Sequence, residues 1–287
     1  MSLDDKKVHV ARLSWEGVKI THLVLPPYEA ADLTNIAAPG SVAIGYYGQK
    51  GAAIQGVNGR TLSIDVSPGE IGLTGPYPIR WLRLRQRAEV VEVSASRELR
   101  AEVAAEMGAE RFCSLDDLRG QHDPLVWAIM SRLRAGASGN ATLTDVERDE
   151  LVRRLYARVF HVVFNVPEPK APGLDPLRFK RVVGFIESQL HGRLSLAALA
   201  RSAALSPFHF ARAFKLATGW APHQFVTLRR LERARHLLLR NDRTVEEIAT
   251  SVGFVNTSHF RRLFRAHLGA LPSALRGGRL LPTDSRR

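Results

Sequence analysis

The sequence predicts an α+β protein whose N-terminal part is rich in β-strands and whose C-terminal part is entirely helical. Three observations support this class. Between residues 8 and 92, short apolar runs alternate with Gly, Pro and Asn. Four prolines and one glycine then occur within the eleven residues 166–176. Finally, two basic segments of helical pattern, "HFARAFKLATG" at 209–219 and "HFRRLFRAHLG" at 259–269, are near copies of each other.

The N-terminal runs predict a small antiparallel sandwich or barrel over residues 1–115. Runs such as "SVAIGYY", "TLSIDV" and "IRWLRLRQRAEVVEV" have the length and composition of strands. The intervening "PG", "NG" and "SPGE" are turn signals, because Gly, Pro and Asn adopt the backbone conformations that turns require. Regular spacing of short strands and turns is typical of such folds.

Residues 116–166 predict a pair of helices. Two amphipathic segments, "DPLVWAIMSRLRAG" and "TDVERDELVRRLYARVFHVVFN", are separated by the loop "GASGN". Adjacent helices of this kind form a hairpin, and the longer one could also form a dimer seam. A homodimer is therefore one expected assembly.

The proline-rich segment 167–176 predicts an exposed linker, because neither a helix nor a central strand tolerates so many prolines. The 287 residues also exceed the usual length of one compact domain. We therefore expect a domain boundary at this linker, with a separate helical domain over residues 177–280.

Each of the two near copies predicts a short helix, a tight turn and a second helix. In the first copy, Ser206 can cap the second helix, Pro207 can begin it and Gly219 can end it. Phe210 and Phe214 share one face of that helix, and phenylalanines recur at the same spacing in the second copy. The chain therefore encodes a helix-turn-helix twice, joined by the amphipathic segment "HQFVTLRRLERARHLLLR".

The excess positive charge lies in the helical part of the chain. Residues 1–173 contain 21 Lys+Arg and 21 Asp+Glu, so their charges balance. Residues 174–287 contain 20 Lys+Arg and 7 Asp+Glu, and the difference of 13 equals the net charge of the whole chain, +13. Such segregation is expected when one domain meets a polyanion and the other does not. Because a cationic helix fits the major groove, the pattern predicts double-stranded DNA as a partner.

The C-terminal residues resemble the DNA-binding domain of the AraC/XylS family of transcription regulators. The resemblance covers residues 177–277 and is carried by "LSLAALARSAALSPFHFARAFKLATGWAPHQFV" and "TVEEIATSVGFVNTSHFRRLFRAHLGALPSALR". Leu275 stands where that family usually has a tyrosine. The resemblance implies a sequence-specific transcription regulator, an activator that works with RNA polymerase.

The resemblance and the cationic faces together give candidate DNA contacts. The positions that read bases in that family fall on Phe208, Ala211, Arg212, Thr257, Ser258, Arg261 and Arg262. The candidate phosphate contacts are Lys215, Arg229, Arg230, Arg265, His209 and His259. The two histidines could instead pack against the preceding helices. Because Ala211 is small, the first reading helix could sense DNA shape or a thymine methyl group rather than form hydrogen bonds.

The N-terminal part resembles, more loosely, the cupin-like sensing domain of such regulators, best in "SIDVSPGEIGLTGPYPIRWLRLRQRAEVVEVSASREL". The resemblance implies a small β-barrel that binds an effector. Four aromatic residues could line a pocket for a small organic effector, although core packing is their commoner role: Trp15, Tyr46, Tyr47 and Trp81. The arginines of "RLRQR" at 83–87 could likewise bind an anion or simply face solvent.

Other functional classes receive less support from the residues. His9, His22 and His122 are scattered, so we expect neither a metal nor another cofactor. An enzyme or DNA-repair protein that carries a DNA-targeting module is the main alternative, but Cys113 has no activating neighbour, so we expect no enzyme. A constitutive DNA binder without an effector is a third hypothesis.

The expected location is the cytoplasm. The single cysteine suits a reducing compartment. The segment "MSLDDKKVHV" lacks the pattern of a signal peptide, and the chain has no apolar run long enough to cross a membrane.

Overall fold

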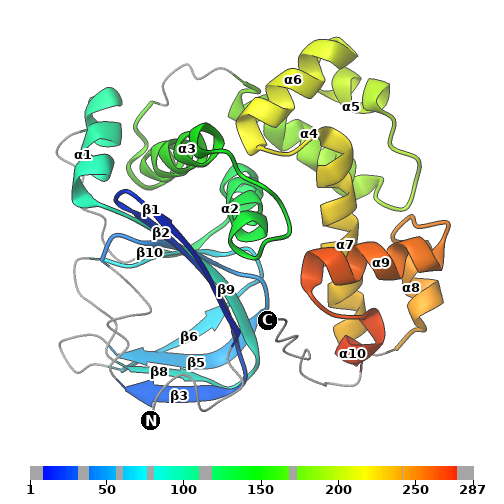
Figure 1. The fold of residues 1–287 in the computed structure, drawn as a ribbon, viewed down its shortest axis with the longest axis horizontal. Helices are drawn as coiled ribbons and strands as arrows, with labels where there is room; N and C mark the ends of the chain where they lie inside the picture. The colour runs from blue at the N-terminus through cyan, green and yellow to red at the C-terminus, as the bar shows by residue number, and fades with distance from the viewer. Residues whose placement is uncertain are drawn as a thin grey trace. The chain divides into compact units, whose positions relative to one another are not determined.

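The structure is a computed structural model that describes residues 9–31, 39–55, 61–75, 81–109, 118–167, 173–240 and 242–276. Contacts divide the chain into two compact units, Met1–Lys170 and Ala171–Arg287 (Figure 1). The first unit combines strands with helices and the second is helical. The predicted α+β class is therefore confirmed.

The N-terminal unit contains two antiparallel sheets. The larger sheet has six strands, in the order β1 (His9–Trp15), β2 (Val18–Leu25), β9 (Ala88–Ala95), β4 (Val42–Gly45), β7 (Ile71–Leu73) and β10 (Leu118–Gln121). The smaller sheet has four, in the order β3 (Tyr28–Ala31), β8 (Trp81–Leu84), β5 (Gln49–Gln55) and β6 (Thr61–Val66). Among the described strands neither sheet closes on itself, so the pairing shows two open sheets, and the barrel that the cupin-like resemblance implies is not confirmed.

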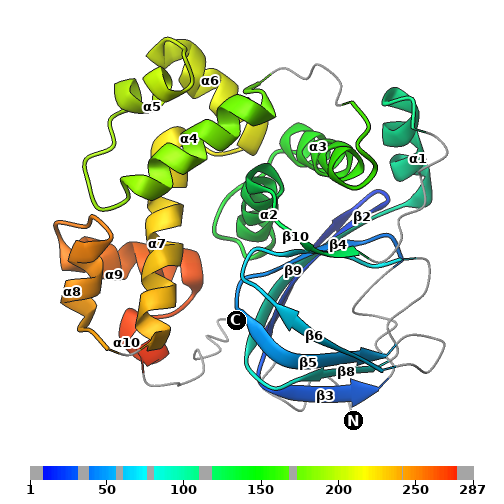
Figure 2. The same ribbon diagram turned by 180° about the vertical axis from the view of Figure 1, so that it is seen from behind.

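The core of the N-terminal unit lies on both faces of the larger sheet. On one face, Leu23 and Leu25 of β2 pack with Ala52, Leu84 and Ala88, which links the two sheets. On the other face, α2 (Pro124–Ala137) contacts β1, β2 and β9 (Figure 2). Because β2 is covered on both faces, it reads as a nearly continuous buried run rather than as an alternating strand.

Two further helices complete this unit. The helix α3 (Asp145–Phe164) packs against α2 and α1 (Arg97–Glu106). The hairpin predicted for 116–166 therefore forms within the chain, whereas its use as a dimer seam stays a prediction. Within the described ranges, no helix is both long and apolar enough to cross a membrane.

A buried carboxylate joins the sheet to α2. The Oε1 atom of Glu89 lies 2.9 Å from Nη1 of Arg134 and 3.0 Å from Nε2 of His22. The other ring nitrogen of His22 lies 2.8 Å from Oγ of Ser138, at the end of α2. The Arg134 guanidinium also lies 4.0 Å from the centre of the Tyr46 ring. These contacts offset the cost of burying the charge of Glu89.

The C-terminal unit is built around one long helix, α7 (Pro222–Arg240) (Figure 1). Within residues 173–240 and 242–276, three helices precede α7 and three follow it. They are α4 (Pro176–Ser188), α5 (Leu196–Ser202), α6 (Pro207–Thr218), α8 (Val245–Ser251), α9 (Thr257–Leu268) and α10 (Pro272–Arg276). The pairs α5–α6 and α8–α9 pack against each other, and α6, α8, α9 and α10 each contact α7.

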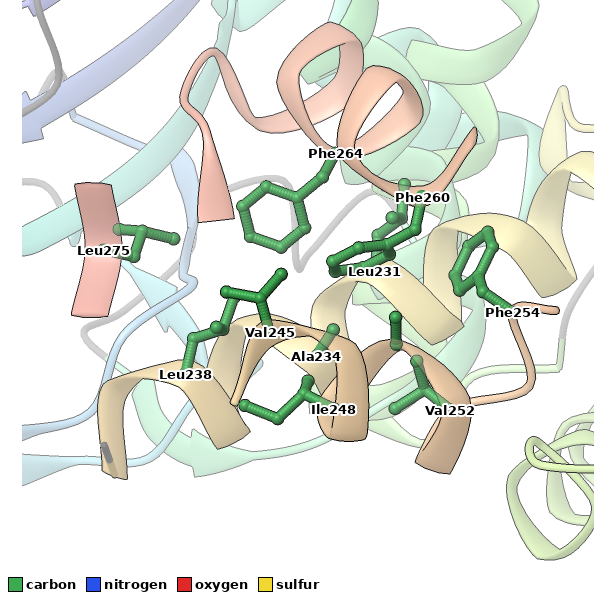
Figure 3. Packing of buried hydrophobic residues seen from close by; sticks show 11 residues of the cluster. Leu231, Ala234, Leu238, Val245, Ile248, Val252, Phe254, Phe260, Phe264 and Leu275 are labelled. Carbon is green, nitrogen blue, oxygen red and sulfur yellow. The ribbon is translucent and has the colours of Figure 1, made fainter. Parts of the chain in front are cut away.

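Phenylalanines fill the cores at both ends of α7. Near its start, the rings of Phe179 and Phe214 have centroids 5.5 Å apart, and those of Phe214 and Phe225 are 5.3 Å apart. Near its end, Phe260 and Phe264 of α9 lie among aliphatic side chains of α7 and α8 (Figure 3). The predicted amphipathic character of α7 is confirmed, because one side of the helix is buried through Phe225, Leu228, Leu231 and Leu238.

We expect Tyr156→Phe to lower the free energy of unfolding of the N-terminal unit by about 1–3 kcal/mol. The Tyr156 hydroxyl accepts from the Ala95 N–H at 3.1 Å and lies 3.1 Å from the oxygens of both Gly40 and Val93. Burial raises the pKa of Tyr156 above its usual value, so the group stays protonated and able to donate. Urea unfolding followed by circular dichroism measures the change. An unchanged midpoint and slope would contradict this role for the hydroxyl.

Candidate nucleic-acid interface

The two second helices, α6 and α9, begin and end in the same way. Oγ of Ser206 accepts from the His209 N–H at the start of α6, and Oδ1 of Asn256 accepts from the His259 N–H at the start of α9. Each helix spans 12 residues and ends at a left-handed glycine, Gly219 with φ 75° and Gly269 with φ 72°. The predicted cap at Ser206 and stop at Gly219 are confirmed.

Buried phenylalanines fix which face of each helix points inward. Phe210 and Phe214 of α6 and Phe260 and Phe264 of α9 are all 0% exposed. Because they recur four residues apart, they define one face of each helix, and the opposite face must point outward. The sequence repeat therefore encodes two helices with matched buried and outward faces.

The outward faces carry most of the predicted base-reading side chains. On α6, Arg212 is exposed, Phe208 is 73% exposed, and Ala211 is half-buried. On α9, Ser258, Arg261 and Arg262 are exposed and Thr257 is half-buried. Lys215 and Arg265, predicted to contact phosphates, are also exposed on these two helices. These predicted base and phosphate contacts therefore lie on the outward faces of α6 and α9. The face of α6 is apolar at its start, and the face of α9 is strongly cationic.

A capping box fixes the start of α8, the helix before α9. The Thr244 side chain accepts from the Glu247 N–H, and the Glu247 carboxylate accepts from the Thr244 N–H. This second hydrogen bond holds the pKa of Glu247 below its usual value. The neighbouring Glu246 forms an ion pair with Arg261 at 2.5 Å, so α8 also restrains one predicted base-reading side chain.

Two of the predicted phosphate contacts have bonds inside the unit. Nε of Arg229 lies 2.5 Å from a carboxylate oxygen of Glu187 on α4. Arg230 donates to the backbone oxygens of Leu190 at 2.9 Å and Gly192 at 2.6 Å. These bonds give both side chains a structural role within the unit, and their predicted phosphate contacts stay a prediction.

The two predicted histidines lie at matching places on the surface. His209 and His259 are both exposed at the starts of α6 and α9. Nδ1 of His209 lies 2.8 Å from Oγ of Ser206, and the His259 ring has its centre 6.2 Å from that of Phe254. Both the phosphate contact and the local packing predicted for them are thus compatible with their positions.

A groove of about 600 Å³ lies between the two halves of this unit. Its walls come from the end of α4, the outer side of α7 and the end of α8. Arginines contribute much of the lining, namely Arg233, Arg240 and Arg243. The sequence did not predict this groove, because it depends on how three separate helices pack.

Three of the four predicted effector residues have described side chains. Tyr46 and Tyr47 are buried, whereas Trp15 is half-buried and donates from Nε1 to Oδ1 of Asp149 at 2.5 Å. Tyr46 hydroxyl and Ser131 Oγ lie 3.1 Å apart. These contacts are those of packed residues. The side chain of Trp81 lies outside the described part of the structure.

The histidines of the N-terminal unit are closer than the sequence suggests. The rings of His9 and His22 have centres 6.0 Å apart, and burial lowers the pKa of His9 from its usual value. Even so, the described residues contain no group of three His, Cys, Asp or Glu side chains that could hold a metal. Cys113, on which the repair hypothesis depends, lies outside the described residues.

Known proteins match the C-terminal unit. A family model described as a helix-turn-helix domain matches residues 199–278. The HTH-type transcriptional activator RhaS of Escherichia fergusonii is 36% identical over 102 residues, which cover 36% of this chain and 37% of that protein. The MmsAB operon regulatory protein of Pseudomonas aeruginosa is 37% identical over 110 residues, which cover 37% of this chain and 36% of that protein. The chain thus matches only about a third of the length of these relatives.

A solved structure is also similar to this unit. It is a transcriptional regulator from Chromobacterium violaceum, described as containing an AraC-type DNA-binding domain. The sequence identity is 27%, the alignment covers 37% of this chain and 95% of that chain, and the TM-score is 0.35.

We expect Asn256→Ala to lower the free energy of unfolding of the C-terminal unit by about 0.5–2 kcal/mol. The substitution removes the side chain that accepts from the His259 N–H at 2.8 Å, at the start of α9. Asn256→Asp is the matched control, because its carboxylate oxygen can still accept from the His259 N–H. Urea unfolding of the two variants would contradict the capping role if their midpoints were equal.

Proposed function

We propose that the chain is a sequence-specific DNA-binding activator of transcription, because its C-terminal part matches a helix-turn-helix family model and is similar to transcription regulators. One observation supports this most directly: α6 and α9 bury matched phenylalanine faces and direct their polar faces outward. The matched relatives are transcription regulators, which favours this function over the repair or other enzyme hypothesis.

The dimensions of the scaffold suit two contacts with one duplex. With 19 residues, α7 is about 28 Å long at about 1.5 Å per residue. The reading helices pack near its two ends, and successive major grooves on one side of DNA lie about 34 Å apart. Each of α6 and α9 is long enough to enter a major groove with its first turns.

The proposed roles differ between the two helices. On α9, Arg261 and Arg262 carry planar donor groups that suit guanine, with Thr257 and Ser258 beside them as smaller hydrogen-bonding groups. On α6, Arg212 has the same chemistry, whereas Phe208 and Ala211 suit a thymine methyl group or DNA shape.

The phosphate backbone would be held by charge and by backbone donors. Lys215 and Arg265 are exposed and cationic, and the free N–H groups at the starts of α6 and α9 suit a phosphate. His209 and His259 lie at those same helix starts, so we keep them as phosphate contacts.

The N-terminal unit is proposed to sense a small organic effector, with a cupin-like fold and with the helical hairpin available for a homodimer. Its separation from the DNA-binding unit supports a sensory role. An effector would act by binding more tightly to one of two arrangements of the chain. Contact with RNA polymerase and a cytoplasmic location belong to the same proposal.

We expect Arg262→Ala to reduce discrimination between selected and scrambled DNA by about 1–3 kcal/mol. The variant loses a donor fork that suits guanine and leaves the buried face of α9 intact. Duplexes selected from a random pool by the full chain supply the target for a mobility-shift assay. Arg181→Ala is the matched control, because Arg181 is exposed on α4 and its removal changes the net charge equally. Full discrimination by Arg262→Ala would refute the assignment.

Lys215→Ala should weaken binding to every duplex similarly and reduce the slope of log K against log salt concentration by about 1. The physical reason is that a phosphate contact releases counterions but reads no base. Titrations of the selected and the scrambled duplex at several salt concentrations measure both effects. A change of sequence preference with an unchanged salt slope would instead assign Lys215 to a base.

A further inference from the structure

We propose that Arg230 sets the spacing at which the two reading helices meet DNA. This inference depends on the proposed function, and it assigns a positioning role to a side chain that is hydrogen-bonded within the unit. It arises from a junction at which the two halves of the C-terminal unit meet beside α7.

The first half of the unit is bound to this junction through its backbone. The loop that leads from α4 into α5 presents two carbonyl oxygens, those of Leu190 and Gly192, to the Arg230 side chain. The distances are 2.9 Å from Nε and 2.6 Å from Nη2. Two donors of one planar group therefore fix the loop in both position and orientation relative to α7.

The second half reaches the same point through a glycine. Gly253 lies in the turn between α8 and α9 and has a φ of +90°. A Cβ atom added there would lie 2.5 Å from the Leu190 oxygen and 2.9 Å from Cζ of Arg230. The turn of the second helix-turn-helix thus lies directly against the arginine and against the loop of the first.

Beside this junction a groove lies between the two halves. The groove of about 600 Å³ is lined by Leu190 and His191 on one side and by Ser251 and Val252 on the other. Because side chains do not fill the space, direct packing between the halves is weak there. The hydrogen bonds of Arg230 therefore add a direct link between the two halves to the packing of α6 and α9 on α7.

The consequence for DNA is a spacing requirement. Adding one base pair between two contact sites moves the second site by about 3.4 Å along the axis and turns it by about 35°. A rigid pair of helices cannot follow this change, so it loses one of its two contacts. A loosened pair can follow it, at the cost of weaker binding to the preferred spacing.

The test uses the full chain and a selected duplex in which the two contact sites are moved apart or together by one base pair. We expect the unaltered chain to lose roughly tenfold or more in affinity for either change, because one contact is lost. Arg230→Met should bind the preferred duplex more weakly and show a penalty of about twofold, because its helices can adjust. An unchanged ratio between spacings in Arg230→Met would overturn the proposal.

Three further variants make the result specific. Gly253→Ala disturbs the junction from the opposite side and should reduce the spacing penalty in the same way. Arg233→Met is the matched control, since Arg233 is an exposed arginine three residues further along α7, and it should keep the full penalty. Arg230→Lys retains the charge but not the two-donor geometry, and it decides the question if Arg230→Met does not fold.

A measurement without DNA separates this inference from the proposed function. Spin labels at Leu216→Cys on α6 and Ala266→Cys on α9, in a Cys113→Ser background, report the distance between the two helices. Both positions are exposed. We expect Arg230→Met to broaden this distance distribution and Arg233→Met to leave it narrow. A narrow distribution in Arg230→Met would refute the positioning role, whereas failure of the unaltered chain to select any DNA would refute the proposed function alone.

Discussion

The burial of two phenylalanine pairs against α7 is the constraint on which the rest of the C-terminal unit depends. Phe210 and Phe214 fix the rotation of α6 about its axis, and Phe260 and Phe264 do the same for α9. Once these rings are inside, the outward residues of each helix are determined by geometry alone. Removing such a ring from a core costs about 3–5 kcal/mol, far more than any surface charge contributes, so packing and not electrostatics orients the cationic faces.

Much of this unit could be predicted from the sequence, because the information is local. The caps at Ser206 and Thr244, the stop at Gly219 and the buried side of α7 follow from residues close together in the chain. The sequence did not indicate which arginine side chains of this unit bind oxygen atoms of distant residues. Arg229 and Arg230 belong to a basic segment of the sequence. Their partners, Glu187 and Leu190, lie some forty residues earlier in the chain.

The N-terminal unit shows the opposite balance. Strands and turns were predicted as a class, but the order of the strands depends on pairings between distant segments. β9 lies between β2 and β4, and β7 pairs with β10, none of which a local pattern specifies. The junction of His22 and Arg134 on Glu89 was also hidden, since a scattered histidine gives no sign of the carboxylate that it meets. Trp15 and Tyr46 illustrate the same limit, because composition alone suggests a pocket where the structure shows separate packing contacts.

Under the proposed function, the ion pair between Arg261 and Glu246 has a kinetic consequence for the search along DNA. Both side chains are about half exposed, so Arg261 can leave Glu246 when a base edge of DNA offers it hydrogen-bond acceptors. A phosphate group can replace Glu246 as the partner of Arg261 only by bringing a second negative charge close to the Glu246 carboxylate. Contacts of Arg261 with the phosphates of nonspecific DNA are therefore weakened, and the chain dissociates from such DNA sooner. Under the proposed function, Glu246 thereby favours a rapid search along DNA over a long residence time at each nonspecific site.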